Sequence, residues 1–203
     1  MIWILLLFIL WLAAVIFFRV YRIWLPYYAL AAIGSAYWLV AFANTFLFQD
    51  LLAQLVAFSV SQFAGFLGIA TQIFKNAPGL LMVLVITQNV GWTVLQIGVE
   101  SSGMLESIVV VSLVMFYPGW SWGRRIFSVL AGLFMTWGAN ILRLMIIVVL
   151  LHWLGKPVLV IAHTFLAKAA FFGMTVAIYW FLITRPTIYQ VAGLLRRQSL
   201  EKR

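Results

Sequence analysis

The sequence predicts an all-α polytopic membrane protein with about five transmembrane helices, an external amphipathic helix and a β-hairpin. Its 203 residues are 66% hydrophobic and only 8% charged, whereas soluble domains carry roughly 25% charged residues. Apolar runs of membrane-spanning length recur along the chain between short polar segments. Most of the net charge of +9 lies in those segments and in the tail, which is typical of a topology signal and not of a nucleic-acid surface. We therefore expect one integral-membrane domain over residues 1–203, in contact with membrane lipids and without a nucleic-acid partner.

Two leading spans are expected within residues 1–50. The first, residues 2–18, has about the length needed to cross the hydrocarbon core. It lacks a basic leader and a small-residue cleavage site, so we expect a retained span and not a signal peptide. A basic turn with Arg19 and Arg22 separates it from the second span, residues 27–48. Because basic loops favour the cytoplasm, the N-terminus is expected outside.

The segment 51–99 has two interpretations. Residues 80–99 either form a span with a polar interior or a hairpin that turns near residues 88–91. We favour the hairpin, since a polar turn at mid-membrane is costly. Two straight spans in this segment would give the alternative of seven spans. Before the hairpin, residues 51–74 predict an external amphipathic helix, because small or polar side chains recur at helical spacing; they are Gln54, Ser61, Gly65, Gly68 and Gln72.

Three further spans are expected within residues 100–185. Residues 104–117 run inward to a loop with two Trp and two Arg, 126–154 return outward, and 158–184 run inward again. Aromatic belts and cytoplasmic Arg pairs are typical of such loops. The tail 186–203 is basic and therefore expected in the cytoplasm, which predicts a multi-pass plasma-membrane protein.

The densest polar cluster between apolar runs is Glu100-Ser101-Ser102-Gly103, just before the third of these five spans. A hydroxyl at a helix N-terminus often caps it by accepting a backbone N–H. It can also be a nucleophile, because the helix dipole favours developing negative charge there. Both interpretations are open for Ser102, which is expected on the outer side.

Three more polar side chains lie unexpectedly inside apolar runs. Arg143 is costly within a membrane unless it is paired or solvated, and Asn140 lies one turn earlier on the same face. His163 lies about two turns inside the following span. We expect Ser102, Arg143 and His163 to converge on the outer side. The structural alternatives are an ion pair of Arg143 with Glu106 and an ordinary hydrogen-bonded role for His163.

Several chemistries lack the residues they need. The chain has no cysteine, so it has no disulfide, thiolate metal site or thiol nucleophile. No set of residues has metal-ligand spacing, and no Gly-rich phosphate loop follows a strand. We expect no metal and no cofactor.

The order of the motifs resembles the exosortase/archaeosortase family, with its short Gram-positive-type branch as a candidate subgroup. That family has a Cys-Ser-Gly motif, an Asn-x-x-Arg helix and a His in the following span. Here Ser102-Gly103, Asn140 with Arg143, and His163 follow in that order. The resemblance covers residues 50–185, including the helix and hairpin that precede the motif.

The resemblance implies a membrane transpeptidase that works through an acyl-enzyme on the outer face. Its clients would carry a C-terminal sorting motif, one span and a basic tail, and the acyl acceptor is unknown. The nucleophile would attack the peptide carbonyl, His163 would be the general acid and base, and Arg143 would stabilise the oxyanion. Glu100, Gly103 and Asn140 would support them.

We assign Ser102 to the position of the family's catalytic Cys, which is a departure in chemistry. A hydroxyl supplies no standing thiolate and needs a base during attack. Ser102 therefore indicates either a Cys-to-Ser substitution that inactivates the enzyme or a natural member without a thiol. We favour the substitution, because the other motif residues are unchanged.

Two other functions are alternatives for a chain with these residues. A rhomboid-like intramembrane serine protease needs Gly-x-Ser-Gly, but Glu100 occupies the first Gly position and Arg143 would have no role. A transporter or assembly subunit would use Arg143 along an anion path, yet paired interrupted spans in two halves are not visible. Convergence of Ser102, Arg143 and His163 would distinguish these functions from a sorting peptidase.

Overall fold

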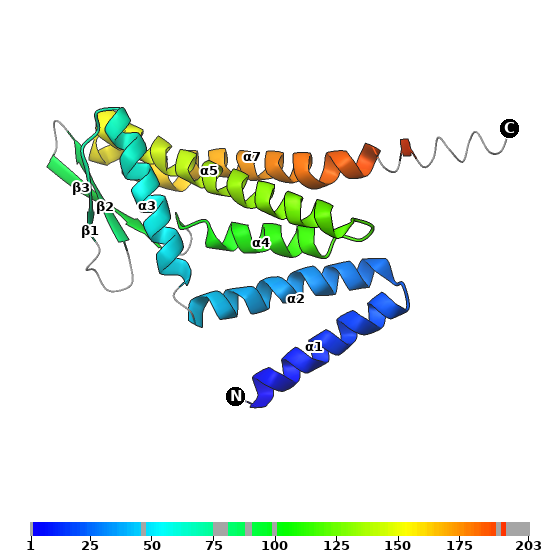
Figure 1. Ribbon diagram of the computed structural model, residues 1–203. Helices are drawn as coiled ribbons and strands as arrows, with labels where there is room; N and C mark the ends of the chain where they lie inside the picture. Colours follow the sequence, from blue (N-terminus) through cyan, green and yellow to red (C-terminus); the bar gives the residue numbers. More distant parts are fainter. Residues whose placement is uncertain are drawn as a thin grey trace.

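The chain is a bundle of apolar helices with a small sheet at one end (Figure 1). The computed structural model describes residues 2–45, 48–74, 81–87, 91–98, 101–189 and 192–193. Within these residues four helices are long and apolar enough to cross a membrane: Trp3–Val20, Trp24–Ala43, Trp122–Leu154 and Leu159–Tyr189. The predicted class, a mainly helical membrane-type protein, is confirmed at this level.

The remaining expected span is shorter than predicted. Residues 104–117 contain α4 (Met104–Met115), a helix of 12 residues. At 1.5 Å per residue it is about 18 Å long, less than the ~30 Å of a hydrocarbon core. The left-handed Gly103 precedes it and a turn at Phe116 ends it, so the local backbone limits its length.

The helices α1 (Ile2–Val20) and α2 (Trp24–Thr45) form an antiparallel pair at the edge of the bundle (Figure 1). The indole Nε1 of Trp11 donates a hydrogen bond to the Leu30 carbonyl oxygen, 2.9 Å away. Gly34 makes room for this ring, because a Cβ there would overlap the Trp11 indole. The packing of one aromatic side chain over one glycine thus helps to hold the two helices together.

The helix α3 (Phe48–Phe66) ends earlier than the predicted helix over residues 51–74. Gly68 has φ +72°, and the N–H groups of Gly68 and Ile69 donate to the Gly65 and Ala64 carbonyls. This is the Schellman arrangement that ends many helices. The helical spacing of small and polar residues continues in the sequence to Gln72, but the backbone helix ends at Phe66.

The face that α3 buries also differs from the predicted polar stripe. Gln54 and Gly65 are exposed. The buried face consists of small and β-branched residues: Ala53, Val56, Ala57, Val60 and Ala64. Small apolar side chains allow close packing on the neighbouring helix, and the larger apolar side chains of α3 remain on the outside.

A three-stranded antiparallel sheet follows α3, in the order β1-β2-β3. The strands are β1 (Thr71–Phe74), β2 (Leu81–Thr87) and β3 (Gly91–Ile97). In the hairpin register Leu81 pairs with Ile97 and Thr87 with Gly91; turn residues 88–90 lie outside the described part. The described residues of 80–99 are extended, unlike the span of the seven-helix alternative. The third strand, β1, was not predicted.

The longest helix, α5 (Trp122–Leu154), lies antiparallel beside the last helical rod (Figure 1). That rod comprises η2 (Lys156–Val158), α6 (Leu159–Ile161), the π-helical η3 (Ala162–Leu166), α7 (Ala167–Tyr179) and the π-helical η4 (Trp180–Thr184), and it continues as helix to Tyr189. The main core lies among α3, the sheet, α5 and α7, and includes Val56, Val60, Ile97, Leu144, Val148 and Ala167.

The two ends of the bundle differ. The sheet and the C-terminal part of α3 lie at one end, whereas the α1–α2 turn, the α4–α5 loop and the end of the last rod lie at the other (Figure 1). The turn that leads into α4 is therefore at the end that carries the sheet.

Candidate functional site

The turn between β3 and α4 holds both serines in a fixed backbone. The N–H groups of Ser101 and Ser102 both donate to the Gly98 carbonyl oxygen, at 3.0 and 2.9 Å. Gly103 then adopts φ +73°, a conformation that glycine accepts without steric cost. Both serines are buried. The turn is thus a rigid entry to α4 and not a solvated loop.

The Ser102 hydroxyl lies at the first turn of α4. Its Oγ accepts the Met104 backbone N–H at 3.3 Å. This contact satisfies one of the unpaired N–H groups at the helix start, as a cap would, although the N-cap position itself is Gly103. It also places the oxygen at the positive end of the helix, so the nucleophile interpretation is not excluded.

Asn140 connects α5 to this turn. It is fully buried, and its Nδ2 donates a 2.8 Å hydrogen bond to the Ser101 carbonyl oxygen. A Cβ on Gly103 would lie 3.2 Å from the same Nδ2, so the glycine also makes room for the amide. The structure therefore joins two motif segments that lie almost forty residues apart.

Arg143 lies one helical turn beyond Asn140 and is also buried. Its Cζ lies 4.7 Å from the centre of the Phe171 ring on α7. A guanidinium at this distance from an aromatic face is stabilised by the ring's negative potential, the more so when both are desolvated. This contact orients Arg143 within the bundle instead of toward the aqueous ends.

His163 lies in the π-helical segment η3. Its Nδ1 is buried and has no hydrogen-bond partner among the described residues. Single π-helical turns interrupt the regular ladder and are frequent at functional sites. Ala162 and Ala167, on either side, are buried, so this segment packs closely in the bundle.

The structure brings only part of the predicted site into direct contact. Ser101 and Gly103 contact Asn140. Phe171, which Arg143 contacts, is eight residues after His163, about 12 Å along the helix axis. Convergence of His163 with Ser102 and Arg143 stays a prediction, and Glu100 lies outside the described residues.

Two groups at this site, Phe171 and the Ser101 carbonyl, were not predicted from the sequence. A signal for Phe171 was present in the sequence. His163, Ala167 and Phe171 are spaced by four residues, so they lie on one face of a helix. No sequence signal identified the Ser101 carbonyl, since every residue has one.

The described part of the chain shows no metal-binding cluster. No group of three or more His, Cys, Asp or Glu side chains gathers there.

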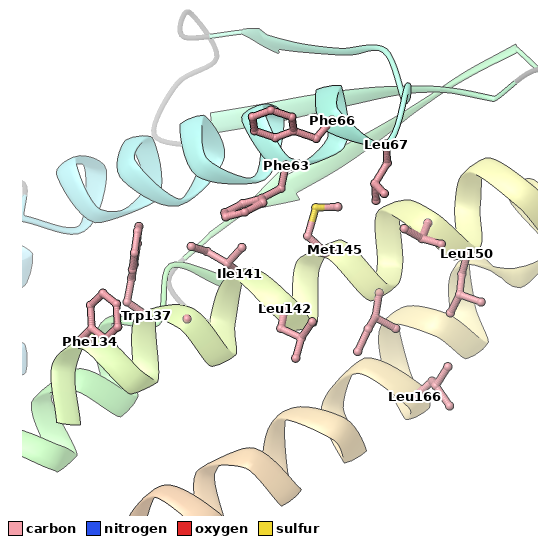
Figure 2. Close-up of a pocket in the computed structure, with 13 residues that line it drawn as sticks. Phe63, Phe66, Leu67, Phe134, Trp137, Ile141, Leu142, Met145, Leu150 and Leu166 are labelled. Carbon is pink, nitrogen blue, oxygen red and sulfur yellow. The ribbon is translucent and has the colours of Figure 1, made fainter. Parts of the chain in front are cut away.

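An open apolar groove of about 880 Å³ lies on a different face of α5 (Figure 2). Phe63 and Phe66 of α3 lie opposite Ile141 and Met145 of α5, and Gly138 leaves its floor open. A well-formed concave pocket is the default active-site hypothesis, but this groove is lined by no titratable or nucleophilic side chain. It cannot perform acid–base or covalent chemistry, so the buried turn at Ser101–Gly103 is the better candidate.

Comparison with family models, with curated proteins and with solved structures found no match to this chain.

Proposed function

We propose that this chain is a membrane peptidase or transpeptidase of the exosortase/archaeosortase type. It would cross the plasma membrane several times and act on its outer face. The basic α1–α2 turn, the α4–α5 loop and the tail would lie in the cytoplasm, which puts the Ser101–Gly103 turn outside.

The observation that carries the proposal is the hydrogen bond from Asn140 to the Ser101 carbonyl, together with the close fit of Asn140 to Gly103. The resemblance rests on separate sequence motifs. Contact between two of them is expected if they serve one site, and chance motifs on distant helices would have no reason to meet.

The proposed chemistry is acyl transfer. The nucleophile attacks the scissile carbonyl carbon, and Arg143 stabilises the resulting oxyanion. His163 takes the nucleophile's proton and gives it to the leaving amine, whose departure leaves an acyl-enzyme. An amine or water then attacks the acyl carbon and gives its proton to His163, and the enzyme nucleophile leaves and regains that proton. The buried, unpartnered Nδ1 of His163 supports its role in moving a proton.

The identity of the nucleophile position needs a test at two residues. Counting back from Gly103, the first residue of a Cys-Ser-Gly order falls on Ser101, so assigning the family's Cys to Ser102 requires an offset of one residue. The Ser102 hydroxyl accepts a hydrogen bond at the start of α4, whereas Ser101 occupies the position that the motif order assigns to the Cys. Both residues are buried in the turn that Asn140 contacts, and both are candidates.

The clients would be exported proteins that end in a short sorting motif, one span and a basic tail. The enzyme would cleave beside the motif and pass the new C-terminus to an acceptor that is not yet identified. The chain would use no cofactor for this chemistry and would act among membrane lipids.

The first prediction is that a thiol restores activity. A thiol has a pKa near 8.5, which a helix N-terminus and a neighbouring cation lower further. Ser101→Cys or Ser102→Cys, whichever residue is the nucleophile, should raise processing by at least about 10²-fold, the lower range for one positioned catalytic group. The assay is the size shift of an exported reporter fused to a candidate tail from the source genome, co-expressed with each variant.

Matched variants identify the cause of any gain. Ser59→Cys adds a thiol at a half-buried position of α3, away from the Ser101–Gly103 turn, and should gain nothing. In the active Cys variant, Arg143→Lys should remove most of the gain because Lys keeps the charge but lacks the planar fork, and His163→Ala should do likewise. Absence of a gain at both positions contradicts the proposal. Fast processing by the unmodified chain, slowed by both substitutions, would instead identify a serine enzyme.

A further inference from the structure

The end of the bundle opposite the sheet is strongly cationic. The α1–α2 turn, the first turn of α5 and the end of the last rod meet at this end (Figure 1). Their charged residues are Arg19, Arg22, Arg124, Arg125 and Arg185. The acidic residues in the described part of the chain, Asp50 and Glu106, lie in the first turns of α3 and α4, toward the other end. Among the described residues, this concentration of positive charge thus has no carboxylate in the same turns.

The loop at the centre of this end is rigid. Trp120 is 5% exposed, and the Arg124 Cζ lies 4.3 Å from the centre of its ring. The Arg125 Nη2 donates to the Tyr117 carbonyl oxygen at 2.9 Å. The Tyr117 hydroxyl is hydrogen-bonded to Thr187 at 2.7 Å, which ties the loop to the last rod. The two guanidinium groups are therefore held in place before any ligand arrives.

These two guanidinium groups retain donors for an anion. Neither is paired with a carboxylate among the described residues, and the Arg125 Nε is buried without a hydrogen-bond partner there. A guanidinium presents five donors in a planar fork that matches a phosphate. The two forks belong to consecutive residues in the first turn of α5, and each can form charge-assisted hydrogen bonds with a phosphate, which are among the stronger ones.

The position of the loop indicates the source of the anion. It lies where apolar helices of membrane-spanning length end. Trp122, which is 63% exposed, lies with its ring centre 5.4 Å from the Arg125 Cζ. Exposed Trp at the end of such a helix is typical of the headgroup layer. Phosphate at that depth belongs to lipid.

We propose that Arg124 and Arg125, held by Trp120 and Tyr117, form a binding site for the headgroup of an anionic phospholipid. The guanidinium groups would bind the lipid phosphate, and Trp122 would pack beside the glycerol backbone. A zwitterionic lipid would bind less well, because its choline cation would meet the arginine cluster. The inference does not depend on the proposed enzymatic function.

The test uses the full chain, purified in detergent and measured by native mass spectrometry with added phosphatidylglycerol or phosphatidylcholine. We expect phosphatidylglycerol to be retained preferentially. One basic residue near an anionic surface is worth about a fivefold change in binding. Arg124→Gln should therefore reduce the preference about fivefold, and Arg124→Gln/Arg125→Gln should reduce it further. Lys168→Gln, which removes an exposed positive charge from the other end of the rod, should leave it unchanged.

Three results would overturn the proposal. One is equal retention of the two lipids by the unmodified chain. The second is an equal loss of preference in Arg124→Gln and in Lys168→Gln, which would indicate a response to net charge alone. The third is full displacement of phosphatidylglycerol by millimolar inorganic phosphate, which would identify a site for soluble phosphate. Because Arg125→Gln also removes the bond to Tyr117, Arg124→Gln is the decisive variant if the double variant fails to fold.

Discussion

At the scale of single residues, the turn before α4 requires two particular residues at once, Gly103 and Asn140. Gly103 has a left-handed backbone, and the space a Cβ would need is occupied by the Asn140 amide. That amide donates to the Ser101 carbonyl. One residue thus permits the backbone of the turn, and the other fixes its orientation against α5.

The Gly103 position gives the second prediction. Gly103→Ala should destabilise the protein by about 1–3 kcal/mol, since a non-glycine residue is strained at this φ and its Cβ crowds Asn140. For a chain of this size that is a fall in apparent Tm of roughly 2–12 °C, measured by thermal unfolding in detergent. Gly138→Ala is the control, because a Cβ there meets nothing within 4 Å. Equal Tm values for the two variants would contradict the role assigned to Gly103.

At the scale of elements, α1 and α3 attach to the bundle in different ways. The helix α3 buries a continuous face of small residues in the main core. The helix α1 contributes to a separate small cluster around Val15, Tyr27 and Ala31, and nearly all of its apolar surface faces outward. Few side chains therefore determine the attachment of α1.

The third prediction tests that attachment. Gly34→Ala should displace the Trp11 ring and break its hydrogen bond to Leu30, because the added Cβ overlaps the indole. With α1 loosened, trypsin should cut faster at Arg19 and Arg22 in the α1–α2 turn, as measured by limited proteolysis in detergent. Gly173→Ala, where a Cβ meets nothing within 4 Å, should leave the rate unchanged. The same cleavage rate in both variants would show that other contacts hold α1.

At the scale of the whole molecule, the bundle separates two chemically different ends. One end carries the sheet, the buried Ser101–Gly103 turn and the start of α4 (Figure 1). The other carries the arginine-rich turns. An uneven distribution of Arg and Lys between the two sides of a membrane protein determines its orientation.

The fourth prediction concerns that orientation. The chain has no cysteine, so single cysteines can be labelled in intact cells with a membrane-impermeant thiol reagent. Asp50→Cys should be labelled and Arg124→Cys should not, until the membrane is permeabilised. Labelling of position 124 without labelling of position 50 would invert the topology and place the candidate site on the cytoplasmic side.

The sequence by itself was sufficient for features that depend on local composition and period. The long apolar runs identified α1, α2, α5 and the last rod, since no soluble fold explains them. In β3, burial alternates, with Thr93, Leu95 and Ile97 inside, because successive side chains of a strand point to opposite faces. The approximate positions of the spans followed from such patterns.

Other features were decided only by tertiary structure or by a single backbone conformation. The end of α3 depends on the left-handed backbone of Gly68. The spacing of apolar residues gives no information on that conformation. The strand β1 exists by pairing with β2, and the contacts of Asn140 with Ser101 and of Arg143 with Phe171 join residues on different elements. Spacing along one helix indicates which residues share a face. It does not indicate which partner that face meets, because the packing of whole helices determines the partner.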